Sequence, residues 1–324
     1  MESSTLDILE GIKSGNRFSL SKGITLVESQ RSDHLPEANA LTRGCFETKK
    51  TAIRIGITGV PGVGKSTFID AFGSHLTGLG LTVAVLAIDP SSQRSKGSIL
   101  GDKTRMDRLS ADPRAYIRPS PSNLNLGGVN SATRQSIILC EAAGFDVVIV
   151  ETVGVGQSET EVYNMVDFFL LLMIAGAGDE LQGIKRGVME LAHAIFINKS
   201  DIDEKAAKLA AQEYRSALKL YPPLEPNWET PVVCGSSLTE QNIPALWKMI
   251  ETFGNDVGQE ALIVKRREQD LRWMQQSIAD LLVIKMSSDS FKEQLVAIET
   301  QVLNGEVTAF EGLQRSLEEI MANR

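Results

Sequence analysis

The central part of the chain, from residue 51 to about residue 256, alternates between short apolar runs and longer stretches in which apolar residues recur at helical spacing. The runs are four to seven residues long, which is the usual length of a buried strand. The predicted strands are 53–58, 82–88, 115–118, 146–151, 168–174, 194–198 and 231–234. Strands that alternate with helices favour a mostly parallel sheet covered by helices on both faces. The sequence therefore predicts an α/β fold.

The two ends of the chain lack this alternation. Residues 1–50 predict two or three short helices. The pattern near the C-terminus is helical throughout, over residues 258–286, 289–303 and 306–322. We therefore expect three parts, which are a helical N-terminal extension (1–50), a central α/β domain (51–256) and a helical C-terminal arm (257–324).

A glycine-rich loop follows the first predicted strand. Residues 59–66 read Gly-Val-Pro-Gly-Val-Gly-Lys-Ser, which matches the phosphate-binding pattern G-x-x-x-x-G-K-[ST] between a strand and a helix. Such a loop surrounds a polyphosphate with backbone N–H groups and the positive end of a helix dipole. We expect Lys65 to reach the β- and γ-phosphates and Ser66 to offer its hydroxyl to Mg²⁺. The predicted nucleotide contacts here are Gly59, Val60, Pro61, Gly62, Val63, Gly64, Lys65, Ser66 and Thr67.

A second motif indicates which base is bound. Asn198-Lys-Ser-Asp201 follows a predicted strand and matches N-K-x-D, in which the Asp carboxylate accepts two hydrogen bonds from guanine. Adenine would leave that carboxylate unpaired, at a cost of about 1–3 kcal/mol. Lys199 is expected to lie over the base plane, and Asn198 to tie the loop to the phosphate-binding segment. Ser236 and Ser237, after the last strand, suit a backbone cradle for the edge of the base. Together with the phosphate-binding loop, the N-K-x-D motif makes GTP or GDP the predicted ligand.

Three acidic residues are candidates for the metal and γ-phosphate end of the site. Glu151 and Asp89 each end a predicted strand, and Asp102 lies in a loop. A carboxylate at a strand tip can hold Mg²⁺ or orient the attacking water. Gly154 would let a backbone N–H approach the γ-phosphate closely. The alternative at each acidic position is a solvated loop acid or a helix cap.

Two segments, 91–105 and 175–187, are rich in glycine and charge. This composition suits switch segments that are ordered by phosphate and metal. Two ordinary surface loops would have the same composition, so glycine content alone does not distinguish the two interpretations.

Composition and charge exclude several other classes of protein. A net charge of −8 and a pI near 5.1 oppose broad nucleic-acid binding, which needs a basic face. The three cysteines are far apart and predict reduced thiols in a cytosol-like compartment, so we expect a cytoplasmic protein. The longest apolar run, 168–175, is too short to cross a bilayer, and we expect no membrane partner.

The chain as a whole closely resembles the MeaB/ArgK/MMAA family of P-loop GTPases. The resemblance rests on Gly-Val-Pro-Gly-Val-Gly-Lys-Ser-Thr (59–67), Asp-Pro-Ser-Ser (89–92), Gly-Ser-Ile-Leu-Gly-Asp-Lys-Thr-Arg-Met (97–106), Glu-Thr-Val-Gly-Val-Gly-Gln-Ser-Glu (151–159), Gly-Asp-Glu-Leu-Gln-Gly-Ile-Lys-Arg-Gly (178–187) and Asn-Lys-Ser-Asp (198–201). It implies a P-loop GTPase domain over 51–256 that uses Mg²⁺. It also implies a chaperone of an adenosylcobalamin-dependent methylmalonyl-CoA mutase, or a related acyl-CoA mutase, that gates cofactor loading and protects the enzyme.

The resemblance assigns roles to matching positions. Lys65 and Ser66 would serve phosphate and Mg²⁺, Asp89 and Asp102 the metal or first switch, Glu151 the second switch, and Asp201 the base. The block 178–187 matches a third switch that responds to the mutase, where Asp179, Gln182 and Lys185 are the residues to test. One departure is Ser237, where the family commonly has alanine, so that the base contact there is less certain.

The C-terminal helices carry an apolar stripe. It includes Leu271, Met274, Ile278, Leu281 and Leu282. Spacing of this kind is more often typical of an intramolecular core. A homodimer through these helices is instead what the family resemblance implies.

Two other classes of function remain as alternatives. A nickel-insertion GTPase would call for Cys-x-x-Cys or a His-rich tract, whereas this chain has three isolated cysteines and only three histidines. A small-molecule kinase, such as one acting in amino-acid transport, would need an acceptor pocket beside the phosphates.

Overall fold

The computed structural model describes residues 3–29, 31–89, 106–121, 128–152, 158–176, 187–225 and 227–322. These residues form two compact units. The first comprises Met1–Asn123 and Gly128–Gln269, and the second comprises Leu124–Gly127 and Asp270–Arg324. The predicted domain division at 256 and 257 stays a prediction, and the first compact unit extends to residue 269.

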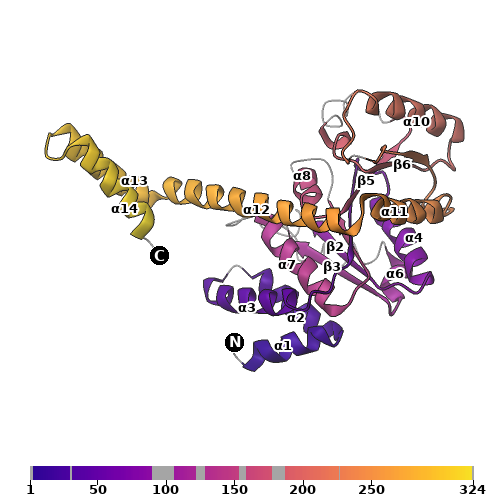
Figure 1. Cartoon of the computed structure of the whole chain (residues 1–324), viewed down its shortest axis with the longest axis horizontal. Helices are drawn as coiled ribbons and strands as arrows, with labels where there is room; N and C mark the ends of the chain where they lie inside the picture. The colour runs from indigo at the N-terminus through magenta and orange to yellow at the C-terminus, as the bar shows by residue number, and fades with distance from the viewer. Residues whose placement is uncertain are drawn as a thin grey trace. The chain divides into compact units, whose positions relative to one another are not determined.

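The first unit is built on a seven-stranded parallel sheet with the strand order β3-β2-β4-β1-β5-β6-β7 (Figure 1). Its strands are β1 (Ile53–Gly59), β2 (Val83–Asp89), β3 (Ala115–Pro121), β4 (Val147–Glu151), β5 (Phe168–Ile174), β6 (Ala194–Asn198) and β7 (Val232–Cys234). All seven correspond to predicted strands, and the predicted α/β class is confirmed. Strands β4 and β6 are buried along their whole length, because helices cover both faces of the sheet.

Helices cover the two faces with separate hydrophobic cores. Among the described residues, the helices wholly within the first unit are α1 (Ser3–Lys13), α2 (Arg17–Val27), α3 (Leu35–Phe46), α4 (Lys65–Gly78), α6 (Asp107–Ala111), α7 (Gly128–Ala143), α8 (Ser158–Tyr163), α10 (Glu204–Leu218) and α11 (Ile243–Val257). A short 3₁₀ turn, Ser32–His34, precedes α3. On one face Phe68 and Phe72 of α4 pack with Trp247 of α11, and on the other Leu20 and Leu41 pack in the core that includes α7.

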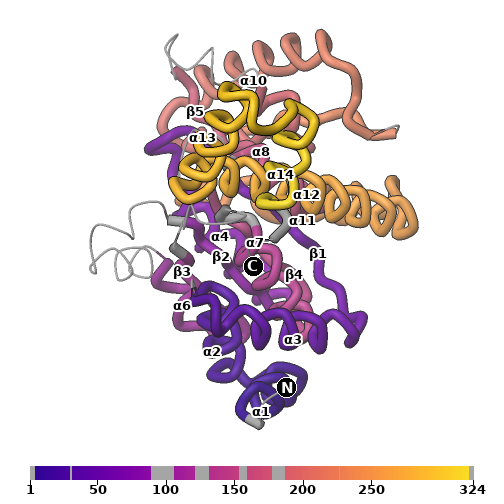
Figure 2. The backbone as a smooth tube through the Cα atoms, turned by 90° about the vertical axis from the view of Figure 1, so that its left-hand side faces the viewer, coloured from indigo at the N-terminus to yellow at the C-terminus, as the bar shows by residue number. Residues whose placement is uncertain are grey.

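The predicted N-terminal helices are confirmed as three α-helices. They pack on one another and on α7, so that they cover that face of the sheet without contributing a strand (Figure 2). Cys45 of α3 and Cys140 of α7 are buried free thiols, and burial raises the pKa of Cys45 to about 12. The third cysteine, Cys234, is also free.

The described part of the second unit is helical. It contains the later part of α12 (Gln259–Ser287), together with α13 (Asp289–Leu303) and α14 (Ala309–Ala322), which pack against each other (Figures 1 and 2). α14 begins three residues after the predicted start at 306, because Thr308 and Glu311 form a reciprocal capping box. Gly312 permits the close packing of α14 on α13, since a Cβ there would lie 2.9 Å from Val302.

The apolar stripe on α12 is exposed in the single chain. Its members Leu271, Met274, Ile278, Leu281 and Leu282 are 42–51% exposed. The interpretation of this stripe as an intramolecular core is therefore wrong, because these side chains keep about half of their surface in contact with solvent. Within the described residues, no helix is long and apolar enough to cross a membrane.

Candidate nucleotide-binding site

The glycine-rich loop lies between β1 and α4 at the carboxyl edge of the sheet. Gly62 and Gly64 have φ values of +75° and +92°, which side chains with a Cβ rarely adopt. At Gly59, a Cβ would lie 2.5 Å from the backbone carbonyl oxygen of Leu172 in β5. Each glycine of the motif is thus required by the local backbone. The loop ends at the first turn of α4, which leaves the first N–H groups of that helix without partners within the helix.

Lys65 is the first residue of α4 and folds back over the loop. Its Nζ donates a hydrogen bond to the carbonyl oxygen of Gly59 at 2.9 Å. Burial lowers the pKa of Lys65, while the charges of Glu151 and Glu159 act in the opposite direction. The ammonium group therefore lies in a partly buried environment together with two acidic residues, which suits an interaction with a polyphosphate and its metal ion.

Glu151 ends β4 directly beside β1. It is in register with Ile57 and is 7% exposed. The strand pairing continues one residue further, because the N–H of Thr152 donates to Ile57 at 3.0 Å and its hydroxyl donates to the Thr58 hydroxyl at 2.8 Å. The backbone on both sides of the Glu151 carboxylate is therefore fixed at the strand tip.

Glu159 is a residue of the site that was not predicted from the sequence. It is 1% exposed in α8, and its charge acts on Lys65. A signal was available, since this residue ends the 151–159 block on which the family resemblance partly rests. A buried acid next to a lysine of the phosphate loop is part of the electrostatics of the site.

Asn198 joins three segments at the base end of the site. Its Nδ2 donates to the carbonyl oxygen of Val63 in the glycine-rich loop at 2.8 Å. Its Oδ1 accepts from both the N–H and the hydroxyl of Ser237, each at 2.9 Å. One buried side chain thus links the phosphate loop, the end of β6 and the loop after β7. This is the tie between base loop and phosphate loop that the motif predicts.

Lys199 and Asp201 follow Asn198 in the same turn. Lys199 adopts a left-handed conformation with φ +61°, and its Nζ donates to the carbonyl oxygen of Gly62 at 2.9 Å. Asp201 is exposed to solvent. In the loop after β7, the hydroxyl of Ser236 accepts hydrogen bonds from the N–H groups of Leu238 and Thr239, each at 3.2 Å. The structure therefore brings the predicted base residues next to the predicted phosphate residues.

Several predicted residues are not placed. Asp102, Gly154, Asp179, Gln182 and Lys185 lie outside the described residues, as do most of the two predicted switch segments 91–105 and 175–187. The backbone of Asp89 ends β2 beside Pro121 of β3, and its side chain is outside the description. The roles of these residues stay predictions.

The donor atoms at the phosphate end are oxygen atoms. Ser66 offers a hydroxyl at the start of α4, and Glu151 offers a carboxylate at the tip of β4. Hydroxyl and carboxylate oxygens are the ligands that Mg²⁺ prefers, usually together with water and phosphate. In the part of the chain that the structure describes, no group of three or more His, Cys, Asp and Glu side chains could hold a metal by itself. The residues present fit a metal that is shared with a nucleotide.

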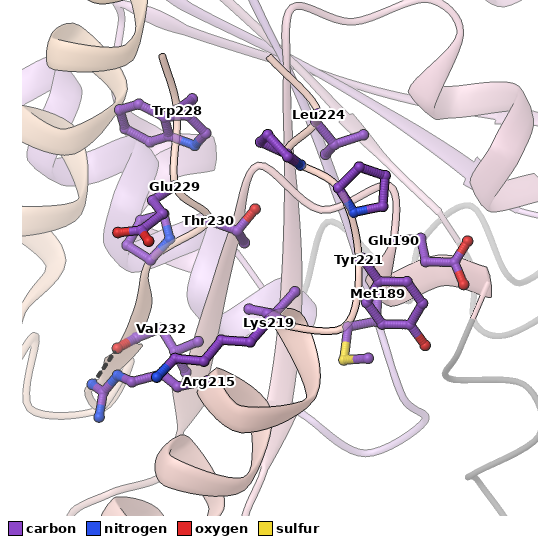
Figure 3. Close-up of a pocket in the computed structure, with 14 residues that line it drawn as sticks. Met189, Glu190, Arg215, Lys219, Tyr221, Leu224, Trp228, Glu229, Thr230 and Val232 are labelled. Carbon is purple, nitrogen blue, oxygen red and sulfur yellow. Dashed lines mark hydrogen bonds between the residues drawn. The ribbon is translucent and has the colours of Figure 1, made fainter. Parts of the chain in front are cut away.

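A separate pocket of about 560 Å³ is lined mainly by residues that precede β6 and β7 in the chain, so it lies at the amino edge of the sheet, opposite the glycine-rich loop. Met189, Tyr221 and Trp228 line it, and Arg215 lies at its side, where its guanidinium donates to the carbonyl oxygen of Val232 at 2.7 Å (Figure 3). None of the predicted site residues lines this pocket. It is therefore distinct from the candidate nucleotide site.

Comparisons with known proteins agree with this geometry. The family model described as "Methylmalonyl Co-A mutase-associated GTPase MeaB" matches residues 20–290. "GTPase ArgK" of Escherichia coli (strain K12) is 40% identical over 310 residues, which cover 94% of this chain and 94% of that protein. "Methylmalonic aciduria type A homolog, mitochondrial" of Mus musculus is 42% identical over 308 residues, covering 91% of this chain and 74% of that protein. A crystal structure named "LAO/AO transport system kinase" has a TM-score of 0.77 and 34% identity, with 99% of both chains covered.

Proposed function

The chain belongs to the family of methylmalonyl-CoA mutase-associated GTPases (MeaB), and on this premise we propose that it binds GTP with Mg²⁺ and hydrolyses it to GDP and phosphate. We further propose that this cycle serves an adenosylcobalamin-dependent methylmalonyl-CoA mutase or a related acyl-CoA mutase. The protein would gate cofactor loading and protect the mutase from inactivation.

The observation that carries the nucleotide part of the proposal is the bridge made by Asn198. It holds the phosphate loop at Val63 and the base loop at Ser237 through three hydrogen bonds of 2.8–2.9 Å. A phosphate-binding loop and an Asp-bearing turn joined in this way match a ligand with a triphosphate at one end and guanine at the other. Asp201 would accept from guanine, and Lys199 would lie along the base.

Hydrolysis of GTP requires positioning and charge neutralisation more than covalent chemistry from the protein. Lys65 would exchange the carbonyl oxygen of Gly59 for phosphate oxygens and thereby offset their charge. A bound Mg²⁺ would polarise the phosphates, with Ser66 and Glu151 as described candidates to hold it or its water. Glu151 would also orient the attacking water, a role that its position at the tip of β4 beside β1 supports.

Family membership supports the mutase as partner, and the third-switch block 178–187 supports a site of action. Docking of the mutase would deliver Lys185 or a neighbouring residue toward the γ-phosphate and so accelerate hydrolysis. Single-turnover hydrolysis by Lys185→Ala, measured with and without the mutase, tests this step. A stimulated rate equal to that of the wild-type protein would exclude it.

The exposed stripe on α12 supports a homodimer through the C-terminal helices. Five neighbouring apolar side chains, each 42–51% exposed, form a surface of the kind that a second copy covers. The charge substitutions Ile278→Glu and Leu282→Glu should give a monomer in sedimentation velocity runs. A dimer that survives both would place the interface elsewhere.

Calorimetry with Mg²⁺ tests the nucleotide assignment directly. We expect binding of GTP and GDP and at least about 100-fold weaker binding of ATP and ADP, because adenine leaves the Asp201 carboxylate unpaired. Asp201→Asn should remove most of this preference. Guanine presents two donors, the ring N–H and the exocyclic amine, and the Asn amide has only one acceptor atom to meet them. Equal affinities for guanine and adenine nucleotides in the wild-type protein would overturn the proposal. Release of free phosphate without any added acceptor would also separate a GTPase from a small-molecule kinase, the alternative that the word "kinase" in the name of the related crystal structure keeps in view.

A further inference from the structure

Two loops form the base end of the candidate site, and Gln241 connects them. The hydroxyl of Ser200 donates to Gln241 Oε1 at 3.1 Å. The backbone N–H of Ser200 donates to the carbonyl oxygen of Gly235 at 3.0 Å. The backbone N–H of Ser236 donates to the carbonyl oxygen of Gln241 at 3.2 Å. Ser200 is 3% exposed, so its hydroxyl needs a partner within the protein. The side chain of Gln241 supplies that partner.

The loop around Gln241 has a conformation that depends on such contacts. Glu240 and Asn242 on either side of Gln241 adopt left-handed conformations, with φ values of +59° and +63°. At Gly235, a Cβ would lie 2.4 Å from the carbonyl oxygen of Gln241, so only glycine permits this approach. Asn242 Nδ2 donates to the carbonyl oxygen of Cys234 at 2.7 Å and holds the end of the loop. The loop therefore presents Gln241 at a fixed place.

Ser200 immediately precedes the residue that would read the base. Lys199 before it has φ +61°, and the N–H of Ile202 donates to the Lys199 carbonyl oxygen at 3.1 Å, which closes the turn. Asp201 is exposed, so the turn that carries it sets the direction of its carboxylate. A carboxylate that accepts two hydrogen bonds from one flat base must be aligned with the base, because hydrogen bonds weaken steeply when they bend.

We propose that Gln241 is a specificity-determining positioning residue. Through the Ser200 hydroxyl it holds the 199–202 turn so that Asp201 accepts hydrogen bonds from both the ring N–H and the exocyclic amine of guanine. The inference rests on the proposed guanine-nucleotide site. Without the Gln241 side chain, the 199–202 turn shifts. Asp201 then loses its hydrogen bond with the exocyclic amine of guanine.

A comparison of GTP with inosine triphosphate isolates that contact, because inosine lacks the exocyclic amine. Gln241→Met keeps the size of the side chain and removes its acceptor. We expect this variant to bind GTP about tenfold more weakly than the wild-type protein does, because one hydrogen bond to the charged Asp201 is lost. Its affinity for inosine triphosphate should stay within about twofold of the wild-type value, because inosine cannot make that bond. Gln241→Glu retains an acceptor for the Ser200 hydroxyl and should keep the wild-type preference for GTP.

Two further variants make the test specific. Ser200→Ala should lower the preference for GTP as Gln241→Met does, and the double variant should be no worse than either single one, because both remove the same interaction. Thr230→Val is the matched control, since it keeps the shape of the side chain and removes a hydrogen bond to the carbonyl oxygen of Ala192, at the amino edge of the sheet and away from Ser200 and Gln241. It should keep the GTP preference.

The results separate three cases. A lower ratio of GTP to inosine triphosphate affinity in Gln241→Met, restored in Gln241→Glu, supports the inference. Equal weakening of both nucleotides, or additive losses in the double variant, would overturn it and leave Gln241 a structural residue of the loop. A wild-type protein that binds guanine and adenine nucleotides equally would instead overturn the proposed function.

Discussion

The two edges of the parallel sheet use polar residues in opposite ways. At the carboxyl edge, the side chains of Asn198 and Gln241 form hydrogen bonds between loops, while Asp201 stays exposed. At the amino edge, charged side chains are buried and bind one another. The first arrangement prepares groups for a ligand, and the second satisfies its groups within the fold.

Asp167 is central to the amino edge. Its carboxylate accepts hydrogen bonds from the backbone N–H of Arg54 at 2.8 Å and from two nitrogens of Arg266, at 2.7 and 2.6 Å. Arg54 in turn makes a bidentate pair with Glu141, with both distances 2.8 Å. These residues come from β1, α7, the start of β5 and α12, so the cluster ties the first part of α12 to the sheet.

A second buried group lies beside it. Lys265 Nζ donates to Glu225 Oε1 at 2.7 Å and to the carbonyl oxygen of Asp167 at 3.3 Å, and it lies 2.9 Å from His193 Nε2. Burial lowers the pKa of His193 to about 4, against the opposing effect of Glu225. The side-chain interaction with His193 has the largest effect on the pKa of Glu225. Together with the hydrogen bond and charge of Lys265, it lowers this pKa to about 2. At neutral pH the ring is therefore neutral and the carboxylate is charged.

The difference suggests which edge determines activity and which determines stability. A ligand-binding edge needs groups that are positioned but not yet satisfied, whereas buried charges are tolerated only when they are paired. Substitutions at the carboxyl edge should therefore change nucleotide binding and hydrolysis with little effect on unfolding. Those at the amino edge should do the reverse.

The largest effect is expected for Lys65→Ala at the carboxyl edge. Hydrolysis of GTP should slow by about 10²–10³-fold, because the γ-phosphate loses a positioned cation in a partly buried site. The free energy of unfolding should fall by no more than about 1 kcal/mol, since only the hydrogen bond to Gly59 is lost. Single-turnover hydrolysis and urea unfolding measure the two quantities. A large loss of stability with a near-normal rate would contradict the division between the two edges.

The next largest effect is expected for Asp167→Ala at the amino edge. Its removal takes away the carboxylate that pairs with the Arg266 guanidinium and accepts from the Arg54 N–H, and the free energy of unfolding should fall by about 3 kcal/mol. Affinity for GTP should stay within about threefold of wild type. Asp146→Ala is the matched control, since this exposed carboxylate binds Thr82 at the same edge without a cation, and its loss should cost about 1 kcal/mol.

The sequence was most informative where the relevant residues are contiguous. Strands such as Phe168–Ile174 could be predicted because burial on both faces gives an unbroken apolar run. The glycine-rich loop and the Asn198–Asp201 turn are short motifs whose spacing alone carries their chemistry. The start of α14 was missed although its signal, Thr308 followed three residues later by Glu311, is a sequence pattern.

The interactions between distant segments could not be predicted in this way. Gln241 is forty-one residues from Ser200 in the sequence, and nothing in its local pattern indicates that pairing. In the sequence, Asp167 and His193 resemble ordinary polar residues just before a strand, and Lys265 resembles an ordinary polar residue within a helix. Only the parallel topology, which brings the starts of β1, β5 and β6 to one edge, makes them a buried cluster. For the same reason α12 up to residue 269 is part of the first compact unit.

The smallest effect is a loss of stability in mild acid that originates at His193. Its pKa is about 4 in the folded protein and about 6.5 in the unfolded chain, so between these values the unfolded chain binds more protons and stability falls as the pH falls. Protonation of the ring would also place a hydrogen on Nδ1, which accepts from the Phe169 N–H at 3.0 Å. We expect a loss of about 2 kcal/mol in the free energy of unfolding between pH 7.5 and pH 5. His193→Asn retains an acceptor for Phe169 but cannot become charged, so urea unfolding of this variant should lose most of that pH dependence. An unchanged slope against pH would assign the acid sensitivity to groups other than this edge of the sheet.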